Sequence, residues 1–128
     1  MIGRINHIAM VVPDLDVAAA QWRDVLGADI SVPNIVEDHG VRTVFIRSVN
    51  GQVELMEPYG DKSPILRFLQ RNPDGGLHHI CYEVNQLVSK RKVLRHRQPV
   101  TLVEHHLGTS WLLMMMMGLI QSSRHNMR

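Results

Sequence analysis

Cysteine and long apolar runs are both scarce in this sequence. Cys81 is the single cysteine among 128 residues, so no disulfide can form within the chain. The longest apolar run, Trp111 to Ile120, reaches about half of the roughly 20 residues that cross a bilayer, and Gly118 interrupts it. The first residues lead directly into a strand pattern and do not resemble a signal peptide. We therefore expect a cytoplasmic protein with no membrane partner.

Acidic residues are almost absent from the last third of the chain. Residues 86–128 hold seven Lys and Arg but one acidic residue, Glu104, whereas residues 1–85 hold seven Lys and Arg against eleven acidic residues. A basic tail can bind nucleic acid, but Lys90 to Arg97 lacks the interleaved aromatic residues that single-strand binding uses. We expect a solvated helix face followed by an irregular end, and no nucleic-acid partner.

Two stretches of the chain are similar to each other. Ile5–Val12 reads Ile-Asn-His-Ile-Ala-Met-Val-Val and Leu77–Val84 reads Leu-His-His-Ile-Cys-Tyr-Glu-Val, so that His7 and His79 occupy matching places. Alternate residues of a strand share a face, which separates His79 from its neighbour His78. A repeated unit with one histidine on the same face of two strands is one way to build a metal site at a pseudo-twofold axis.

Periodicity and turn signals predict an order of elements along the rest of the chain. A helix on residues 15–26, closed by Gly27, should pack Trp22 against a sheet. Three strand-like runs follow, then a short helix with Ser63 as its cap, and Pro73 to Gly76 end that segment. The expected elements after the first strand are a helix at 15–26, strands at 28–36, 41–49, 52–58 and 77–84, a helix at 85–98, and strands at 99–103 and 111–117.

Glu54 lies in the middle of a strand pattern, with apolar neighbours on both sides. A carboxylate there is costly unless it is paired or coordinates a metal. The alternative is an edge strand in which Glu54 faces water, and the residue pattern alone leaves both open.

Residues 1–85 resemble the methylmalonyl-CoA epimerases, a family of the vicinal oxygen chelate superfamily. Lactoylglutathione lyases share the strand histidine, but the Ser63-Pro64-Ile65 linker and the Gly-Gly-Leu-His-His run favour the epimerases. The matching stretches, in order, are Arg4-Ile5-Asn6-His7-Ile8-Ala9, Val12-Pro13-Asp14-Leu15, Asp38-His39-Gly40-Val41, Val53-Glu54-Leu55-Met56-Glu57-Pro58, Ser63-Pro64-Ile65, Phe68-Leu69 and Gly75-Gly76-Leu77-His78-His79-Ile80-Cys81.

The resemblance implies an α+β fold of paired βαβββ modules within one domain, 1–128. The first module would span 1–60, a linker 61–76, and a second, incomplete or altered module 77–128. It also implies that His7, Glu54 and His79 hold a divalent metal ion, with cobalt first and zinc, manganese or nickel as alternatives. A homodimer is the expected assembly.

The implied reaction is the interconversion of the R and S forms of methylmalonyl-CoA, an acyl-CoA substrate, by proton abstraction through a metal-stabilised enolate. The family's C-terminal glutamate, both a ligand and a base, has no match here, and Thr43 at the place of the opposite base cannot serve. The catalytic residues therefore stay unassigned. Residues 86–128 are interpreted as natural divergence, or as the product of a shifted reading frame or truncation. The alternatives are a non-catalytic metal- or ligand-binding member of the fold and a glyoxalase-type lyase.

Overall fold

The structure is a computed structural model that describes residues 2–84, 100–107 and 110–116. It separates into two compact units, one formed by residues 1–7 with 79–128 and the other by residues 8–78. The described elements are β1 (Ile2–Val11), α1 (Leu15–Asp24), β2 (Asp29–Ile30), β3 (Asn34–Val36), the 3₁₀ turn η1 (Glu37–His39), β4 (Val41–Ser48), β5 (Gly51–Pro58), α2 (Leu66–Arg71), β6 (Gly76–Val84), β7 (Val100–Leu107) and β8 (Ser110–Met116).

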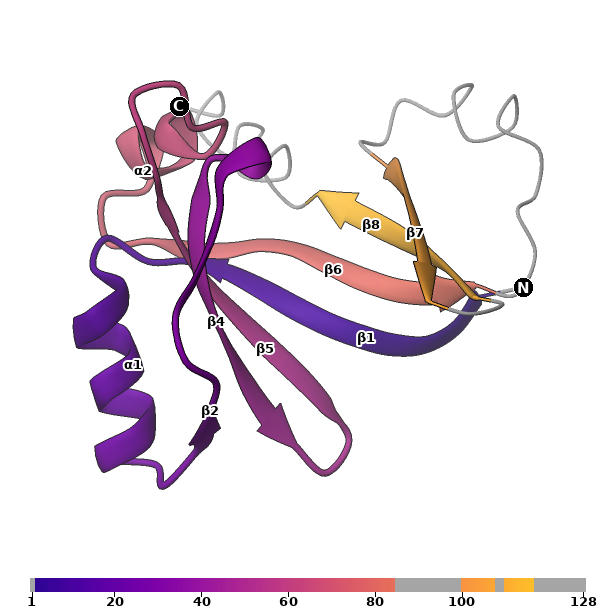
Figure 1. Ribbon diagram of the computed structural model, residues 1–128, viewed down its shortest axis with the longest axis horizontal. Coiled ribbons are helices and arrows are strands. Elements are labelled where there is room, and N and C mark those ends of the chain that lie inside the picture. The colour runs from indigo at the N-terminus through magenta and orange to yellow at the C-terminus, as the bar shows by residue number, and fades with distance from the viewer. Residues whose placement is uncertain (1, 85–99, 108–109, 117–128) are drawn as a thin grey trace, which may run out of the picture. The chain divides into compact units, whose positions relative to one another are not determined.

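In the unit of residues 8–78 the strands lie in the order β2-β4-β5-β1, and β3 pairs with β4. The strands predicted at 41–49 and 52–58 are confirmed as β4 and β5, which pair antiparallel up to Ser48 and Gly51 (Figure 1). β1 pairs parallel with β5, with Ala9 opposite Glu54. β5 is therefore hydrogen-bonded on both sides, and the alternative that placed Glu54 on an edge strand is wrong.

The single strand predicted at 28–36 is wrong, because two short strands, β2 and β3, occupy that range. Pro33 lies between them and has no backbone N–H with which to continue a ladder. Ser31 holds the intervening segment to β4: its N–H donates to Phe45 O at 2.8 Å, and its hydroxyl accepts the Phe45 N–H at 2.8 Å.

α1 begins after Asp14, whose side chain accepts the Val17 N–H at 3.0 Å, and it covers one face of this unit's sheet (Figure 1). The predicted packing of Trp22 is confirmed, since it lies against a buried cluster of Leu15, Ala19, Val44, Ile46 and Leu55. The helix predicted at 15–26 is too long, however. The helix ends at Asp24, and both apolar residues that follow it, Val25 and Leu26, are exposed.

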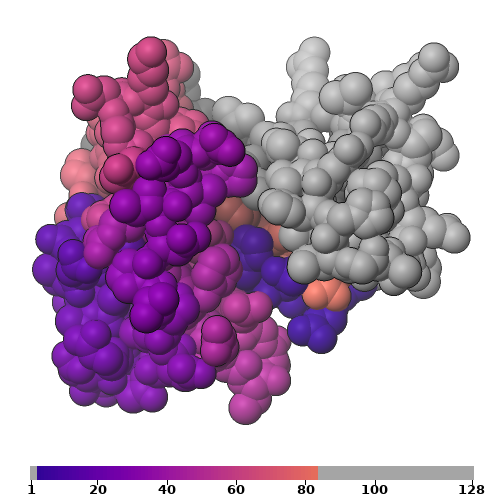
Figure 2. Space-filling view, in the orientation of Figure 1, coloured from indigo at the N-terminus to yellow at the C-terminus, as the bar shows by residue number. Residues whose placement is uncertain are grey.

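The opposite face of the sheet carries a second buried cluster, made of Ala9, Val11, Val41, Met56 and Ile65, with Phe68 and Leu69 of α2 packed against it. The predicted Ser63 cap is wrong, because α2 begins two residues later and its N-cap residue is Ile65. Figure 2 shows the violet and magenta side chains of the β2–β5 region forming a continuous surface on the face in view.

In the other unit β6 pairs antiparallel with β8, which pairs antiparallel with β7. Both strands predicted after residue 98 are therefore confirmed as strands, and β7 extends further than expected, to Leu107. The helix predicted at 85–98 and the irregular end at 121–128 lie outside the described residues. No helix among the described residues is long and apolar enough to cross a membrane.

Candidate metal centre

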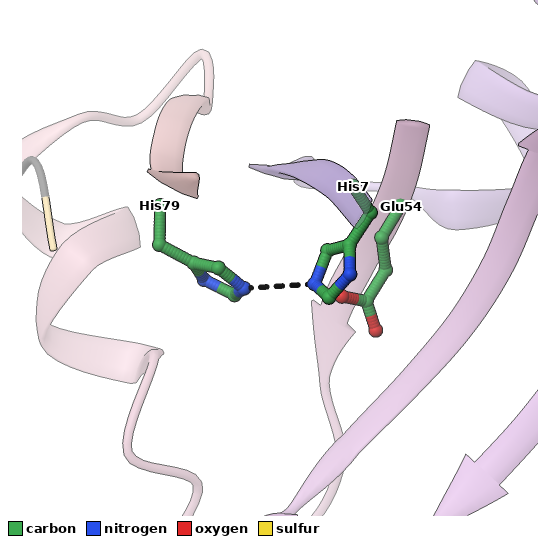
Figure 3. A group of neighbouring side chains, drawn as sticks. All are labelled: His7, Glu54 and His79. Atoms are coloured by element: carbon green, nitrogen blue, oxygen red, sulfur yellow. Dashed lines mark hydrogen bonds between the residues drawn. The ribbon is translucent and has the colours of Figure 1, made fainter. Parts of the chain in front are cut away.

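The two predicted histidines meet in the unit formed by residues 1–7 and 79–128. His7 Nε2 lies 3.2 Å from His79 Nε2, and the two rings meet edge to face (Figure 3). His79 is buried, and His7 is partly buried. Burial lowers the pKa of His7, which favours the neutral imidazole that a metal ion needs.

The spacing of these two nitrogens suits a shared ion. Two imidazole nitrogens at about 2.0–2.1 Å from a tetrahedral ion would lie roughly 3.3 Å apart. The observed 3.2 Å therefore needs little rearrangement. The geometry also suits a direct imidazole hydrogen bond, in which one ring carries hydrogen on Nε2 and the other does not.

His78 faces away from this pair, as the alternation of strand residues predicts. Its ring makes an edge contact with Phe68, with centroids 5.3 Å apart, and burial lowers its pKa. Cys81 lies two residues beyond His79 and is buried. The prediction that separates His79 from His78 is confirmed.

Glu54 is described within the unit of residues 8–78, where it is partly buried on β5. Its neighbour Thr43 on β4 is buried, and the Thr43 hydroxyl lies 3.0 Å from Glu54 Oε1 and 3.0 Å from Leu55 O. Burial raises the pKa of Glu54, and the hydrogen bond from Thr43 opposes that rise. Glu54 is therefore a carboxylate whose negative charge a cation would stabilise.

Sequence reasoning missed two supporting residues. Thr43 was considered only as a base, whereas in the structure it hydrogen-bonds Glu54. Asn6 directly precedes His7, and its Oδ1 lies 2.9 Å from His7 Nδ1. An Asn immediately before a candidate ligand histidine was the available signal, because an amide can bind the second ring nitrogen.

Glu104 lies in β7, which extends beyond the strand predicted at 99–103. Its side chain lies outside the described residues, so the structure assigns it no contact with the histidines.

Comparisons with known proteins identify the family of the chain. The profile of the Glyoxalase/Bleomycin resistance protein/Dioxygenase superfamily matches residues 6–108. The ethylmalonyl-CoA/methylmalonyl-CoA epimerase of Cereibacter sphaeroides is 52% identical over 95 residues, which cover 74% of this chain and 71% of the relative. The human mitochondrial methylmalonyl-CoA epimerase is 48% identical over 86 residues, covering 67% of this chain and 49% of that protein.

A solved structure of methylmalonyl-CoA epimerase from Mycobacterium tuberculosis is 29% identical, with a TM-score of 0.64, and the match covers 80% of this chain and 68% of that one. The chain thus spans about half the length of its human relative and more of the bacterial ones. The α+β fold and its βαβββ pattern follow from these matches as well as from the described strands. The chain belongs to the glyoxalase/bleomycin resistance superfamily, also called vicinal oxygen chelate, and within it to the methylmalonyl-CoA epimerase family.

Proposed function

We propose that this chain is a metal-dependent epimerase of methylmalonyl-CoA, with His7, Glu54 and His79 as the metal ligands. The observation that carries the proposal is the approach of His7 Nε2 to His79 Nε2 at 3.2 Å. Each of the three side chains offers one ligand atom, an imidazole nitrogen or a carboxylate oxygen. Two nitrogens and one carboxylate oxygen suit a first-row divalent ion and leave coordination positions for a substrate.

Strand register supports the inclusion of Glu54. Ala9 of β1 pairs with Glu54 of β5, and His7 comes two residues earlier on the same face of β1. Neighbouring positions on one sheet face are within reach of long side chains. Metal binding would also offset the cost of burying the Glu54 carboxylate.

A divalent ion at this place would act as a Lewis acid toward a carbonyl oxygen, which makes the adjacent carbon more acidic. The chain's own contribution is to orient the ligands: neutral imidazoles from two strands, and a carboxylate held by Thr43. Thr43 is buried and hydrogen-bonds Glu54, so it is not the base. The acid–base pair that moves the proton is not assigned by the described residues.

The substrate follows from the family. The relative from Cereibacter sphaeroides is named for ethylmalonyl-CoA and methylmalonyl-CoA, and the human relative for methylmalonyl-CoA. We extend an acyl-CoA substrate to this chain, and methylmalonyl-CoA in particular. Cobalt as the metal, a homodimer, a cytoplasmic location and one domain with modules at 1–60 and 77–128 remain predictions.

Exchange of the hydrogen on the substrate's central carbon with solvent deuterium tests the proposal. Purified protein, stripped of metal and then loaded with Co²⁺, should exchange that hydrogen in methylmalonyl-CoA, and the stripped protein should not. His79→Ala should abolish both cobalt binding and exchange, whereas the matched His78→Ala should retain both. Cobalt binding without exchange would favour the non-catalytic alternative, and loss of cobalt binding in His78→Ala alone would reject the ligand assignment.

A further inference from the structure

A chain of hydrogen-bonded and charged side chains leads away from His7 on the side opposite His79. His7 Nδ1 lies 2.9 Å from Asn6 Oδ1, and Asn6 Nδ2 donates to Glu83 Oε1 at 3.0 Å. Arg4 Nε lies 3.6 Å from the same Glu83 oxygen. All four residues belong to the unit formed by residues 1–7 and 79–128. The contacts therefore lie within one compact unit.

The partners along this chain determine which atoms carry hydrogen. A carboxylate oxygen only accepts, so the side of the Asn6 amide that faces Glu83 must be its NH₂ group. The Asn6 carbonyl oxygen is then turned toward His7 and also only accepts. His7 Nδ1 must therefore carry the hydrogen of that bond.

The proton on Nδ1 leaves the other nitrogen of His7 with a lone pair. In a neutral imidazole one nitrogen donates and the other accepts, so His7 Nε2 is the acceptor. The bond between the two Nε2 atoms then requires that His79 Nε2 carry hydrogen and donate it. The two histidines of the pair thus differ in tautomer in the metal-free protein.

We infer that Asn6, held by Glu83, is a positioning residue that fixes His7 as its Nδ1–H tautomer and presents the Nε2 lone pair to a metal ion. The tautomer assignment stands on hydrogen bonds alone, whereas the consequence for metal binding rests on the proposed function. Hydrogen-bond partners of this kind set the ring orientation of ligand histidines, and their removal costs roughly 10- to 100-fold in metal affinity.

The tautomers can be read directly in the metal-free protein. Long-range ¹H–¹⁵N correlation spectra of ¹⁵N-histidine-labelled protein distinguish a protonated from an unprotonated ring nitrogen. The His7 signals are identified by their absence in His7→Gln. We expect a protonated Nδ1 for His7 and a protonated Nε2 for His79, and the opposite pair of tautomers would overturn the inference.

Metal affinity supplies the second readout, by titration of Co²⁺ against a chelator with detection of the cobalt absorption bands. Asn6→Leu removes the acceptor, and we expect the affinity for Co²⁺ to fall roughly 10- to 100-fold. We also expect the Nδ1–H form to be no longer the main tautomer of His7. Asn34→Leu makes the same substitution at an exposed strand position and should change neither.

A double variant distinguishes the loss of this hydrogen bond from misfolding of Asn6→Leu. Asn6→Asp combined with Glu83→Gln exchanges donor and acceptor: the new carboxylate accepts from His7 Nδ1, and the new amide donates to that carboxylate. This variant should recover both the tautomer and the affinity. If Asn6→Leu matches the wild-type protein in both readouts, or if the double variant recovers neither, the role of Asn6 is rejected. If the wild-type protein binds no cobalt while its tautomers are as stated, the proposed function fails and the tautomer assignment survives.

Discussion

Thr43 and Glu54 lie on neighbouring antiparallel strands, and the buried Thr43 hydroxyl donates to Glu54 Oε1 at 3.0 Å. This bond lowers the pKa of the Glu54 carboxyl group, whereas burial raises it. It fixes the direction of the carboxylate at Oε1. Thr43 therefore supports a ligand without being one.

Thr43→Val keeps the shape of the side chain and removes the hydroxyl. We expect cobalt affinity to fall by about 10-fold, the lower end of the range for lost supporting hydrogen bonds, and the pKa of Glu54 to rise further. Chelator competition with Co²⁺ measures the affinity. Ser48→Ala removes a hydroxyl from the exposed β4–β5 turn and should leave affinity unchanged. Equal affinity in Thr43→Val and wild type would show that the bond does not position Glu54.

The raised pKa of Glu54 makes the metal-free protein's stability depend on pH. Its ordinary value is 4.5, and burial raises it. Just above that value the folded protein holds a proton that the unfolded chain has lost, so the free energy of unfolding falls as pH rises through the folded pKa. Glu54→Gln should flatten this part of the profile and make the metal-free protein more stable at neutral pH. Urea unfolding at a series of pH values measures both effects. If the stability advantage of Glu54→Gln over the wild-type protein grew toward acidic pH, both expectations would be contradicted.

Glu57 of β5 hydrogen-bonds the first residue of α1. Its Oε2 accepts the Leu15 N–H at 2.8 Å, and its Oε1 accepts from Arg42 at 2.9 Å. Glu57→Ala should lower the free energy of unfolding by about 1–2 kcal/mol, as for a lost helix cap. Glu57→Gln keeps an acceptor for Leu15 and should lose less. Chemical unfolding checks this order, with Asp24→Ala, which breaks an exposed ion pair, as a control of negligible effect.

Gly75 cannot be replaced without strain. Its φ is 81°, and a Cβ there would collide with the Val11 carbonyl oxygen. Gly27 has a similar φ of 64° but open space around it. Gly27→Ala should therefore cost only the left-handed penalty of about 1–2 kcal/mol, and Gly75→Ala should cost clearly more. Thermal and urea unfolding compare the two, and equal losses would mean that the backbone of β1 yields to the added methyl group.

The local pattern of the chain predicts much of this structure. The matched places of His7 and His79, and the opposite direction of His78, follow from a repeat combined with strand alternation. The sheet position of Glu54 does not, because whether β5 is central or at an edge depends on its pairing with β1, which one strand's sequence does not contain. Likewise, the sequence does not predict that Asn6 sets the tautomer of His7. That role depends on the hydrogen bond from Asn6 to Glu83, which lies 77 residues away.

Helix ends were harder to predict than helix faces. Val25 and Leu26 continue the apolar spacing of α1, yet both lie beyond its last residue and are exposed. Both residues are apolar and fit the helical spacing, but neither lies within the helix. The chain instead turns at Gly27, and the Ala28 N–H donates to Trp22 O at 3.1 Å.

The parallel pairing of β1 with β5 bears on the order in which the chain folds. β4 and β5 are joined by a tight turn and can pair within microseconds, whereas β1 must wait for a strand that lies beyond α1 and three other strands. On a ribosome, β1 would emerge long before its partner exists. We expect pulse-labelling hydrogen exchange to protect the amides of β4 and β5 before those of β1, so that the strand bearing Glu54 is in place before the strand bearing His7 docks beside it.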